Sequence, residues 1–376
     1  MIAVQGFCGQ QVAVLGLGAG LYFAQDLEVG DLDEGAPELR PDSRYNLDNR
    51  YIVDNYSQSA DVLVTMVKTP PEGCSKYDVL RAMDRLDWRL KNTDGVDSSV
   101  SLVNVSKIVT RALSEGNWNW HALLRNQTII NATIRQAPSG LINTDCSLTP
   151  MMTYLEDHKA DTLKRVTAEV EAFAEEYNEE GRFEFLLGAG NAGIEAATNE
   201  VIAGAKNVML LLVYSVVAFL CLITFRSIMA VLCVVLPLGL TSVLAEAIMA
   251  QVGIGIKVAT LPVIALGVGI GVDYGIYMFT KLERFLKEGY PLQEAYFETL
   301  RTTGKAVAFT GMTLALGVFT WIMSPIKFQA DMGLLLVFMF LWNMIGAIWL
   351  MPALARFLLR PEKIAAKHAA KQAAKS

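Results

Sequence analysis

The sequence predicts a membrane α-helical bundle with five full spans and a partial or weak N-terminal span, joined to an α+β domain outside the membrane. Three observations predict this fold class. Five stretches are apolar over the roughly 18–25 residues that a helix needs to cross a bilayer. A polar, acidic region separates them from the first apolar stretch. Within that region, β-branched runs alternate with segments of helical spacing.

The first apolar stretch, residues 1–25, is predicted to be a partial or weak transmembrane helix. Its densest apolar run, Val12–Ala24, is short, and three glutamines precede it. A signal peptide begins with a charged region, but no Lys or Arg occurs before Arg40. A short membrane helix therefore fits better than a cleaved leader.

Residues 26–205 are predicted to form the external α+β domain. Strands are expected at Asp61–Thr69, Val96–Val105, Ser147–Leu155 and Gly181–Leu187. Helices are expected at Asn49–Ala60, Lys76–Lys91, Trp118–Gln136, Asp157–Tyr177 and Gly190–Ala205. This order predicts two β-α-β units packed as α+β sandwiches, with the last helix running into the membrane.

Charge divides the chain in the same way. Residues 26–205 hold 17 Lys and Arg against 30 Asp and Glu, whereas the whole chain has a net charge of −6. The remainder is therefore basic. A nucleic-acid partner would need a basic face, so the acidity of the polar domain argues against that class of partner.

The region 206–359 is predicted to be the transmembrane bundle. Its spans are expected at about Val208–Phe225, Ile228–Met249, Val258–Phe279, Ala306–Met323 and Gly333–Leu354. Lys and Arg gather in the loops on one side, including an amphipathic segment at 281–305 and a basic tail at 360–376. By the positive-inside rule, these parts are cytoplasmic and the domain is external, periplasmic in a diderm bacterium.

Two of the five cysteines, Cys74 and Cys146, fall in the external domain. A disulfide persists in an oxidising compartment, so the alternatives are a Cys74–Cys146 bridge or two unpaired thiols. Cys8, Cys221 and Cys233 lie in apolar segments and are interpreted as packing residues.

The third full span, LPVIALGVGIGVDYGIYM from Leu261 to Met278, carries the strongest functional signal. Asp273 lies in its apolar run, and a carboxylate at the centre of a membrane helix costs roughly 2.5–3.5 kcal/mol. Gly267, Gly271 and Gly275 recur every fourth residue, so they share one helix face and admit close helix packing.

Other interpretations of this span are weaker. The order G-x-G-x-G inside a membrane helix differs from the G-x-G-x-x-G of nucleotide-binding loops. An intramembrane aspartyl protease would need Gly-x-Gly-Asp and a second membrane Asp, but Val272 intervenes and no other span offers an Asp. The structural alternative, in which Asp273 makes only a packing hydrogen bond, stays open. Glu246, near the external end of the second span, is interpreted as structural or interfacial.

Three strings carry a resemblance to a known family: GVGIGVDYGIYM, VGDLDEGAPELRPDSRYN and RTTGKAVAFTGMTLALGVFTWIMSP. They resemble the C-terminal half of resistance-nodulation-division transporters, and the nearest branch is the MMPL-like exporters of hydrophobic and amphiphilic molecules. The resemblance covers nearly the whole chain. It implies a porter-like external domain and a proton-driven secondary transporter, not an enzyme, with no cofactor or metal.

The resemblance also implies roles for particular residues. Asp273 corresponds to the proton-carrying carboxylate, with Tyr274 as its hydrogen-bonding neighbour. Thr310 and Thr313 on the next span align with polar residues near that proton relay, although their hydroxyls have the alternative of bonding to their own helix. Gly267, Gly269, Gly271 and Gly275 are expected to pack helices beside the relay.

The resemblance leaves one part of the family unmatched. Such transporters have two similar halves, and the first half, with its own acidic helix and external domain, is missing here. We therefore expect a split half or a fragment, located in a bacterial inner membrane. Its partner would be the N-terminal half or a homologous subunit, and its substrate a lipid or another hydrophobic molecule. The alternative from another class is a sterol- or lipid-sensing or scaffolding domain.

Overall fold

The computed structural model describes residues 2–56 and 59–359, which divide into two compact units. One unit is Gly30–Val201, called here the α+β domain. The other combines Met1–Val29 with Ile202–Ser376 and is called the membrane unit. The chain thus leaves the membrane unit once and returns to it through a single long helix.

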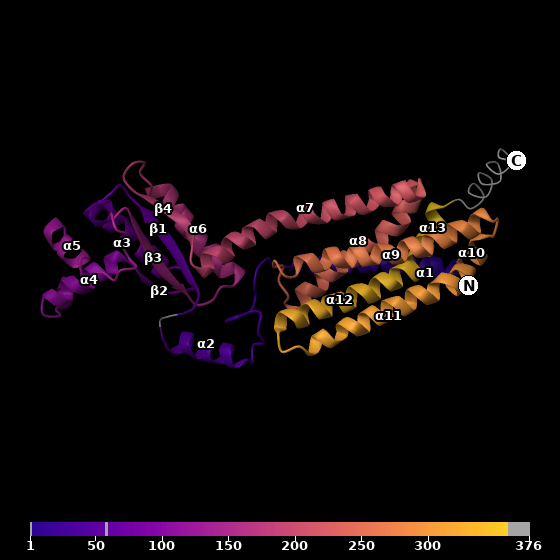
Figure 1. Ribbon diagram of the computed structural model, residues 1–376, viewed down its shortest axis with the longest axis horizontal. Coiled ribbons are helices and arrows are strands. Elements are labelled where there is room, and N and C mark those ends of the chain that lie inside the picture. The colour runs from indigo at the N-terminus through magenta and orange to yellow at the C-terminus, as the bar shows by residue number, and fades with distance from the viewer. Residues whose placement is uncertain (1, 57–58, 360–376) are drawn as a thin grey trace. The chain divides into compact units, whose positions relative to one another are not determined.

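The α+β domain is built on a four-stranded sheet (Figure 1). Its strands are β1 Val62–Lys68, β2 Val96–Val100, β3 Leu148–Leu155 and β4 Glu184–Ala189. The order is β2-β3-β1-β4, and each neighbouring pair is antiparallel. β1 and β2 are therefore parallel with β3 between them, and β3 and β4 are parallel with β1 between them. These are the two β-α-β units, interleaved as in the split ferredoxin-like arrangement.

Two helices, α3 Tyr77–Lys91 and α6 Ala160–Tyr177, pack on one face of this sheet (Figure 1). Leu63 and Val67 of β1 are fully buried, whereas the alternate residues of the strand are half-buried. This alternation is the period of two that a strand with one covered face requires. Phe173 of α6 and Leu86 of α3 fill the core between helices and sheet.

The second predicted strand is too long, because β2 ends at Val100 and helix α4, Leu102–Leu113, begins directly after it. The residues at 102–105 read as a strand because they are Leu, Val, Asn and Val. In the fold, however, Leu102, Ser106 and Thr110 are buried at intervals of four, which is the spacing of a helix face.

Two predicted helices have different bounds. Residues 118–136 hold only a 3₁₀ turn, η2 Trp118–Trp120, and a short helix, α5 Gln127–Ile134. The Asn126 side chain accepts from the backbone N–H of the second and third residues of α5, so it starts a new helix. Upstream, Ser43 caps α2 Arg44–Asn55 in the same way, which moves that helix ahead of the predicted start.

The membrane unit contains the predicted bundle. It contains α1 Ile2–Ala24 and the part of α7, Asn191–Phe225, that follows Val201. Its other helices are α8 Ile228–Val252, α9 Leu261–Lys287, α10 Leu292–Thr299, α11 Lys305–Phe319, α12 Lys327–Ile345 and α13 Met351–Leu358. Single π-helical turns, η3 Leu300–Gly304 and η5 Gly346–Leu350, join α10 to α11 and α12 to α13. When α10 and α11 are counted as one helix, and α12 and α13 as another, five helices in the described residues are long and apolar enough to cross a membrane.

The N-terminal helix α1 has a shorter apolar part, Ala13–Ala24, and packs against α8. The predicted amphipathic segment 281–305 is not a separate surface helix. Its first residues complete α9, and the chain breaks at Gly289, which has a φ of +91°, before Pro291. Its remainder, α10 and η3, continues into α11. The predicted tail 360–376 lies outside the described residues.

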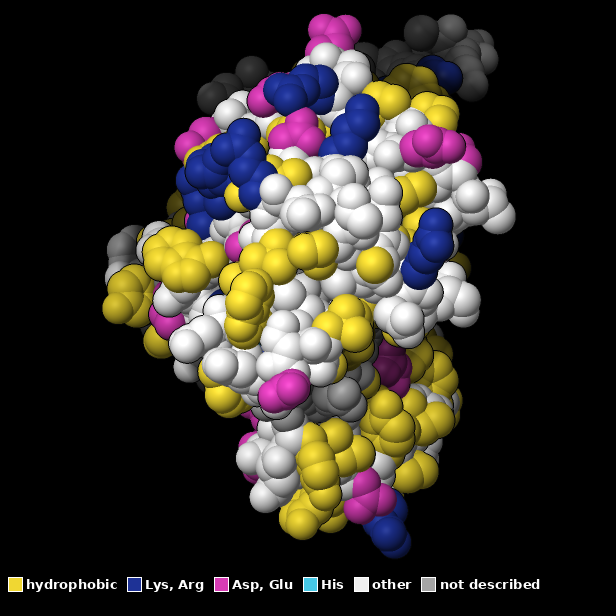
Figure 2. All heavy atoms as spheres, turned by 90° about the vertical axis from the view of Figure 1, so that its left-hand side faces the viewer, with side chains coloured by type: hydrophobic (Ala, Val, Ile, Leu, Met, Phe, Trp, Pro, Cys, Tyr) yellow, Lys and Arg dark blue, Asp and Glu magenta, His cyan; other side chains and the backbone are white. Residues whose placement is uncertain are grey.

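The surface is mixed in charge. Figure 2 shows Lys and Arg side chains among Asp and Glu, with hydrophobic patches between them. In the α+β domain, Trp88, Leu113 and Trp118 are each about 70% exposed, at 69%, 72% and 73%. The described part of this domain thus presents both signs of charge and scattered apolar groups.

Candidate functional site

The glycine face of α9 lies in the groove between α8 and α12. A Cβ atom added to Gly267 would lie 2.3 Å from Met339 Cε, and one added to Gly271 would lie 2.4 Å from Asn343 Nδ2. A Cβ on Gly275 would lie 2.8 Å from a methyl of Val234 on α8. A side chain at any of the three positions would force a neighbouring side chain to shift, so these glycines allow the close packing of helices for which their spacing was interpreted.

Gly269 does not share that packing. A Cβ atom there would meet nothing within 4 Å. It lies on the opposite side of α9, in a row with Leu266, Asp273 and Tyr277, all of which are exposed on the surface of the chain. The four-residue spacing predicted one packed face correctly and did not show that Gly269 lies on another.

Asp273 is the only acidic residue of that exposed row within the apolar run. In the described residues, its carboxylate has neither a hydrogen-bond partner nor an ionic one. The glycine face fixes this orientation, because Asp273 follows Gly271 by two residues and so lies about 200° around the helix. The carboxylate thus points away from α8 and α12.

Tyr274 occupies a different place from Asp273. Its ring is buried, with 3% of the residue exposed, in the hydrophobic core of the membrane unit. Its hydroxyl has no hydrogen-bond partner among the described residues. The expected hydrogen bond to Asp273 is therefore absent from this structure, because consecutive side chains on a helix diverge by about 100°.

Thr310 and Thr313 are exposed on α11, which packs mainly on α12. The Thr313 hydroxyl donates to the backbone carbonyl of Phe309 at 2.7 Å, which is the alternative of bonding to its own helix. The structure does not connect either hydroxyl to Asp273 by a hydrogen bond. It leaves all three side chains on the surface of the membrane unit.

Glu246 has a partner that the sequence did not suggest. Its carboxylate lies 3.1 Å from Lys206 Nζ of α7, and both side chains are mostly buried. This ion pair joins α7 to α8 and satisfies a charge inside the membrane unit. The structural interpretation of Glu246 agrees with this contact.

In the α+β domain, Cys74 and Cys146 form a disulfide with a Cα–Cα distance of 5.2 Å. Backbone pairing brings them together, because Cys74 N–H donates to Cys146 C=O at 2.9 Å. Of the two alternatives, the structure contains the bridge. It ties the start of α3 to the segment before β3.

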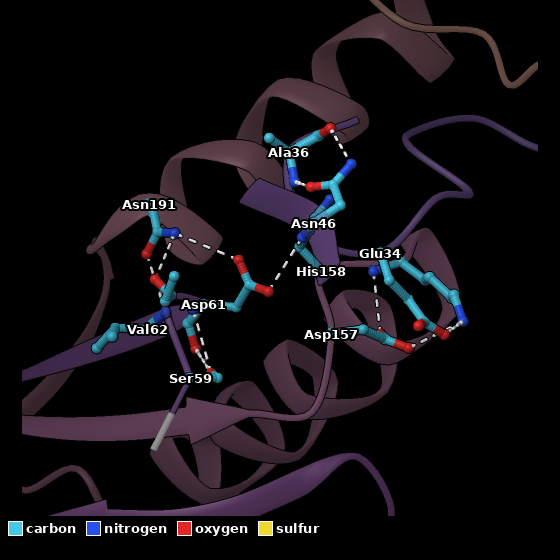
Figure 3. A network of polar contacts seen from close by, with 11 residues as sticks. Glu34, Ala36, Asn46, Ser59, Asp61, Val62, Asp157, His158 and Asn191 are labelled. Carbon is cyan, nitrogen blue, oxygen red and sulfur yellow. Dashed lines mark hydrogen bonds and ion pairs between the residues drawn. The ribbon is translucent and has the colours of Figure 1, made fainter. Parts of the chain in front are cut away.

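The α+β domain also contains a buried polar network that the sequence analysis did not predict (Figure 3). His158, only 2% exposed, lies just before α6, and its Nδ1 is 3.1 Å from the Asp61 carboxylate. Asn191 at the start of α7 accepts from Val62 N–H and donates to the Ala60 carbonyl. The network therefore ties β1, α6 and α7 together.

The electrostatics of His158 follow from these contacts. Burial lowers its pKa, but the hydrogen bond and the negative charge of Asp61 raise it by more, to about 9. The Glu195 carboxylate, on the next turn of α7 after Asn191, adds to the negative field. A lone histidine in a polar stretch has no motif around it, so the sequence carried no signal for this pair.

Within the described residues, no group of three or more His, Cys, Asp or Glu side chains is arranged to hold a metal ion. Within the apolar run of α9, the membrane unit presents one titratable carboxylate, Asp273, on the surface of a tightly packed span.

Comparison with known proteins places these features in a family. The model of the MMPL family matches residues 60–374. A Methanocaldococcus jannaschii protein, named as a membrane protein, is 22% identical over 314 residues, which cover 81% of this chain and 79% of the relative.

Two longer relatives match over shorter stretches. Membrane protein YdfJ of Bacillus subtilis is 33% identical over 23% of this chain and 12% of its own length. MmpL3 of Mycobacterium leprae, named as a probable trehalose monomycolate exporter, is 28% identical over 26% of this chain and 10% of its own length. The matched stretches thus span about a tenth of these two relatives.

Proposed function

This chain belongs to the MMPL family, and we propose that it is the C-terminal half of a proton-driven exporter of lipids or other hydrophobic or amphiphilic molecules. It is a multi-pass membrane protein with a small sheet domain. The likeness to MmpL3, an exporter by name, supports transport over enzymatic catalysis. The substrate class is taken from that family relationship.

The observation that carries the proposal is the unpaired carboxylate of Asp273 on the exposed face of a span. A charged group facing lipid is costly, so membrane carboxylates face a bundle interior or a water-filled cavity. A second half or a homologous subunit that covers this face would place Asp273 inside such an interior. Thr310 and Thr313 then supply hydroxyls near the relay from α11.

A proton carrier couples two conformations when it binds a proton better in one of them. The Asp273 carboxylate is free to bind such a proton, since no side chain among the described residues neutralises it. The acidic domain is external and the C-terminus cytoplasmic in this proposal, following the positive-inside rule. The membrane is then the inner membrane of a bacterium, and protons enter from the external side.

Asp273→Asn tests the proposal. The amide is nearly isosteric but cannot titrate, so export should be lost in the complete transporter, with the other half supplied, while insertion stays normal. Export of the substrate lipid and abundance at the membrane are measured together. Wild-type export by this variant at equal abundance would contradict the proton-carrier role of Asp273.

A companion experiment tests the need for a second half. The chain expressed alone should insert but not export, because the Asp273 face is uncovered. Proton-dependent efflux by the purified chain in liposomes, without a partner of another sequence, would contradict the split-half arrangement unless the chain self-associates. Mass determination in detergent distinguishes these two results. A lipid-sensing or scaffolding domain, the alternative, would tolerate Asp273→Asn in both experiments.

A further inference from the structure

α12 carries one buried amide, Asn343, in the apolar part of the helix that follows Lys327, Gln329 and Asp331. Its exposed fraction is 3%, and it lies in a span with a mean hydropathy of 2.2. Polar side chains inside membrane bundles are rare, and those that occur usually join helices or serve the transport path. What Asn343 contacts therefore bears on what it does.

Asn343 bonds to the backbone of α9. Its Nδ2 donates to the carbonyl oxygen of Gly267 at 2.8 Å. In an α-helix, that carbonyl also accepts from the N–H four residues later, which belongs to Gly271. The oxygen thus has a second lone pair that the amide of another helix uses. Such a bond holds α12 against one defined point of α9.

Gly271 provides the space for this contact. A Cβ atom at Gly271 would lie 2.4 Å from Asn343 Nδ2 and 2.5 Å from its Cγ. Gly267 and Gly271 therefore leave a space on the surface of α9, called here the notch, which the Asn343 amide fills. Close packing alone would be met by an apolar side chain, as it is at Gly275 against Val234.

The other end of the amide is unsatisfied. Asn343 Oδ1 is buried and has no hydrogen-bond partner among the described residues. A buried acceptor without a partner costs free energy, so the amide is a poor choice for stability alone. The bond to Gly267 is thus the contact that accounts for an Asn at this position.

The rotation of α9 about its own axis decides where Asp273 points. The notch lies on one side of the helix and Asp273 about 200° away from Gly271. Any rotation that moved the notch off Asn343 would carry the carboxylate around the surface of the bundle. The contact and the carboxylate are rigidly linked because less than two turns of helix separate them.

We propose that Asn343 is a positioning residue for Asp273: its bond to the Gly267 carbonyl sets the rotation of α9 and so the direction of the carboxylate. This inference rests on the proposed function for its consequence in transport. The geometric part does not, and it is tested on the full chain without any substrate.

Asn343→Leu removes the bond and keeps the same branched arrangement of heavy atoms, although its two methyl groups are larger than the amide oxygen and nitrogen that they replace. The readout is labelling of Asp273 by a hydrophobic carbodiimide, which reacts with protonated carboxyl groups in membranes, followed across pH by mass spectrometry of the full chain in nanodiscs. The rate at a fixed pH should change by about threefold or more, and the midpoint of the pH profile should move. Thermal stability is measured on the same samples.

Thr241→Val is the matched control. Thr241 is also buried in the membrane unit, at 1% exposed, but its hydroxyl donates only to Pro237 of its own helix at 3.0 Å. This variant removes a buried hydrogen bond without releasing α9, so its labelling profile should match that of the wild type. An identical profile for Asn343→Leu and wild type would overturn the proposal.

If Asn343→Leu does not fold, Gly271→Ala takes its place as the test variant. The added methyl fills the notch from the α9 side, and it should change the Asp273 profile in the same direction. In the complete transporter, Asn343→Leu should lower export more than Thr241→Val does. Full export by Asp273→Asn would refute the proposed function only, while the labelling profiles would still decide the positioning role.

Discussion

Charged side chains have different surroundings in the α+β domain and in the membrane unit. In the domain, His158 and Asp61 face each other at 3.1 Å, and buried Asp87 accepts from Lys91 at 2.8 Å. In the membrane unit, Glu246 has Lys206, but Asp273 has no partner in the described chain. Buried Asp61 and Asp87 thus meet partners within the domain, although Asp97 Oδ2 and Glu195 Oε1 are buried there without one among the described residues. Asp273 differs from all of these because it lies in the apolar run of a membrane span.

Burial shows the same difference. Only 6% of the apolar window of α7 and 17% of that in the α10–α11 span are buried within the chain, against 50% for the spans of α8, α9 and α12. Lipid or a partner must cover the exposed apolar surface. An unpaired carboxylate does not suit lipid, so we propose that the partner covers the α9 face.

The largest effect is expected from the disulfide, which among the described residues occurs in the α+β domain alone. Replacing Cys74 and Cys146 by Ser should destabilise that domain by about 4 kcal/mol, since the closed loop between them is long. Hydrogen exchange resolved by segment should show faster exchange in the sheet and unchanged exchange in α8 and α9.

Thiol labelling supplies the control for that prediction. In protein taken from an oxidising compartment without reductant, Cys74 and Cys146 should be resistant to maleimide. Ready labelling of both would contradict the bridge. An equal loss of protection in α8 and α9 would show that the two units do not behave separately.

A slightly smaller effect is expected at the His158–Asp61 pair. The pKa of His158 is raised from 6.5 to about 9, so the charged form stabilises the fold by about 3 kcal/mol. This stabilisation is fully present below pH 6.5 and is lost as pH rises through 9. His158→Asn keeps a hydrogen-bond donor near the Nδ1 position without the charge, and it should destabilise the domain at pH 6 but not above pH 10.

His121→Asn is the matched variant for that experiment. Burial and the nearby Arg111 lower the pKa of His121, so its charged form does not stabilise the domain. Chemical unfolding of both variants across pH should give a stability loss at low pH for His158→Asn alone. A pH-independent loss for His158→Asn would mean that packing, not charge, holds this network.

Substitution of the α9 glycines by Ala should have an intermediate effect on stability, and the effect should differ between the two faces of the helix. Gly271→Ala should destabilise the membrane unit by about 1–3 kcal/mol, because a methyl would collide with Asn343. Gly269→Ala meets nothing within 4 Å and should be neutral or stabilising by up to about 1 kcal/mol, through helix propensity. Unfolding of the single chain in mixed micelles compares them, and equal effects would remove the distinction between the faces.

The smallest effect is expected at the unpartnered hydroxyl of Tyr274. Tyr274→Phe should change stability by less than about 0.5 kcal/mol, since no hydrogen bond is lost. Tyr214 on α7 is the matched residue, because its hydroxyl lies 3.0 Å from the Leu238 carbonyl and 2.6 Å from Ser242 Oγ. Tyr214→Phe should cost about 1 kcal/mol. A larger loss at Tyr274 would reveal a partner for its hydroxyl.

The local parts of this fold follow from the sequence. Apolar runs of spanning length predict the five membrane helices, because burial of backbone polar groups in lipid forces each run to be helical. The alternation of strand and helix predicts two β-α-β units, whereas their interleaving into one sheet of order β2-β3-β1-β4 is decided by the tertiary structure. Errors occur where composition misleads, as at residues 102–105, whose β-branched content resembles a strand until the buried spacing of α4 is seen.

The site follows from the sequence only in part. Spacing shows that Gly267, Gly271 and Gly275 share a face, and an acid among apolar residues marks Asp273. It does not show which helices fill that face, that Asn343 from 76 residues away bonds to Gly267, or that Tyr274 points inward. These contacts join segments distant in the chain, and helix periodicity contains no information about the partner across a groove. The same limit hid His158 and Asp61, which are 97 residues apart and meet only because β1 and α6 pack together.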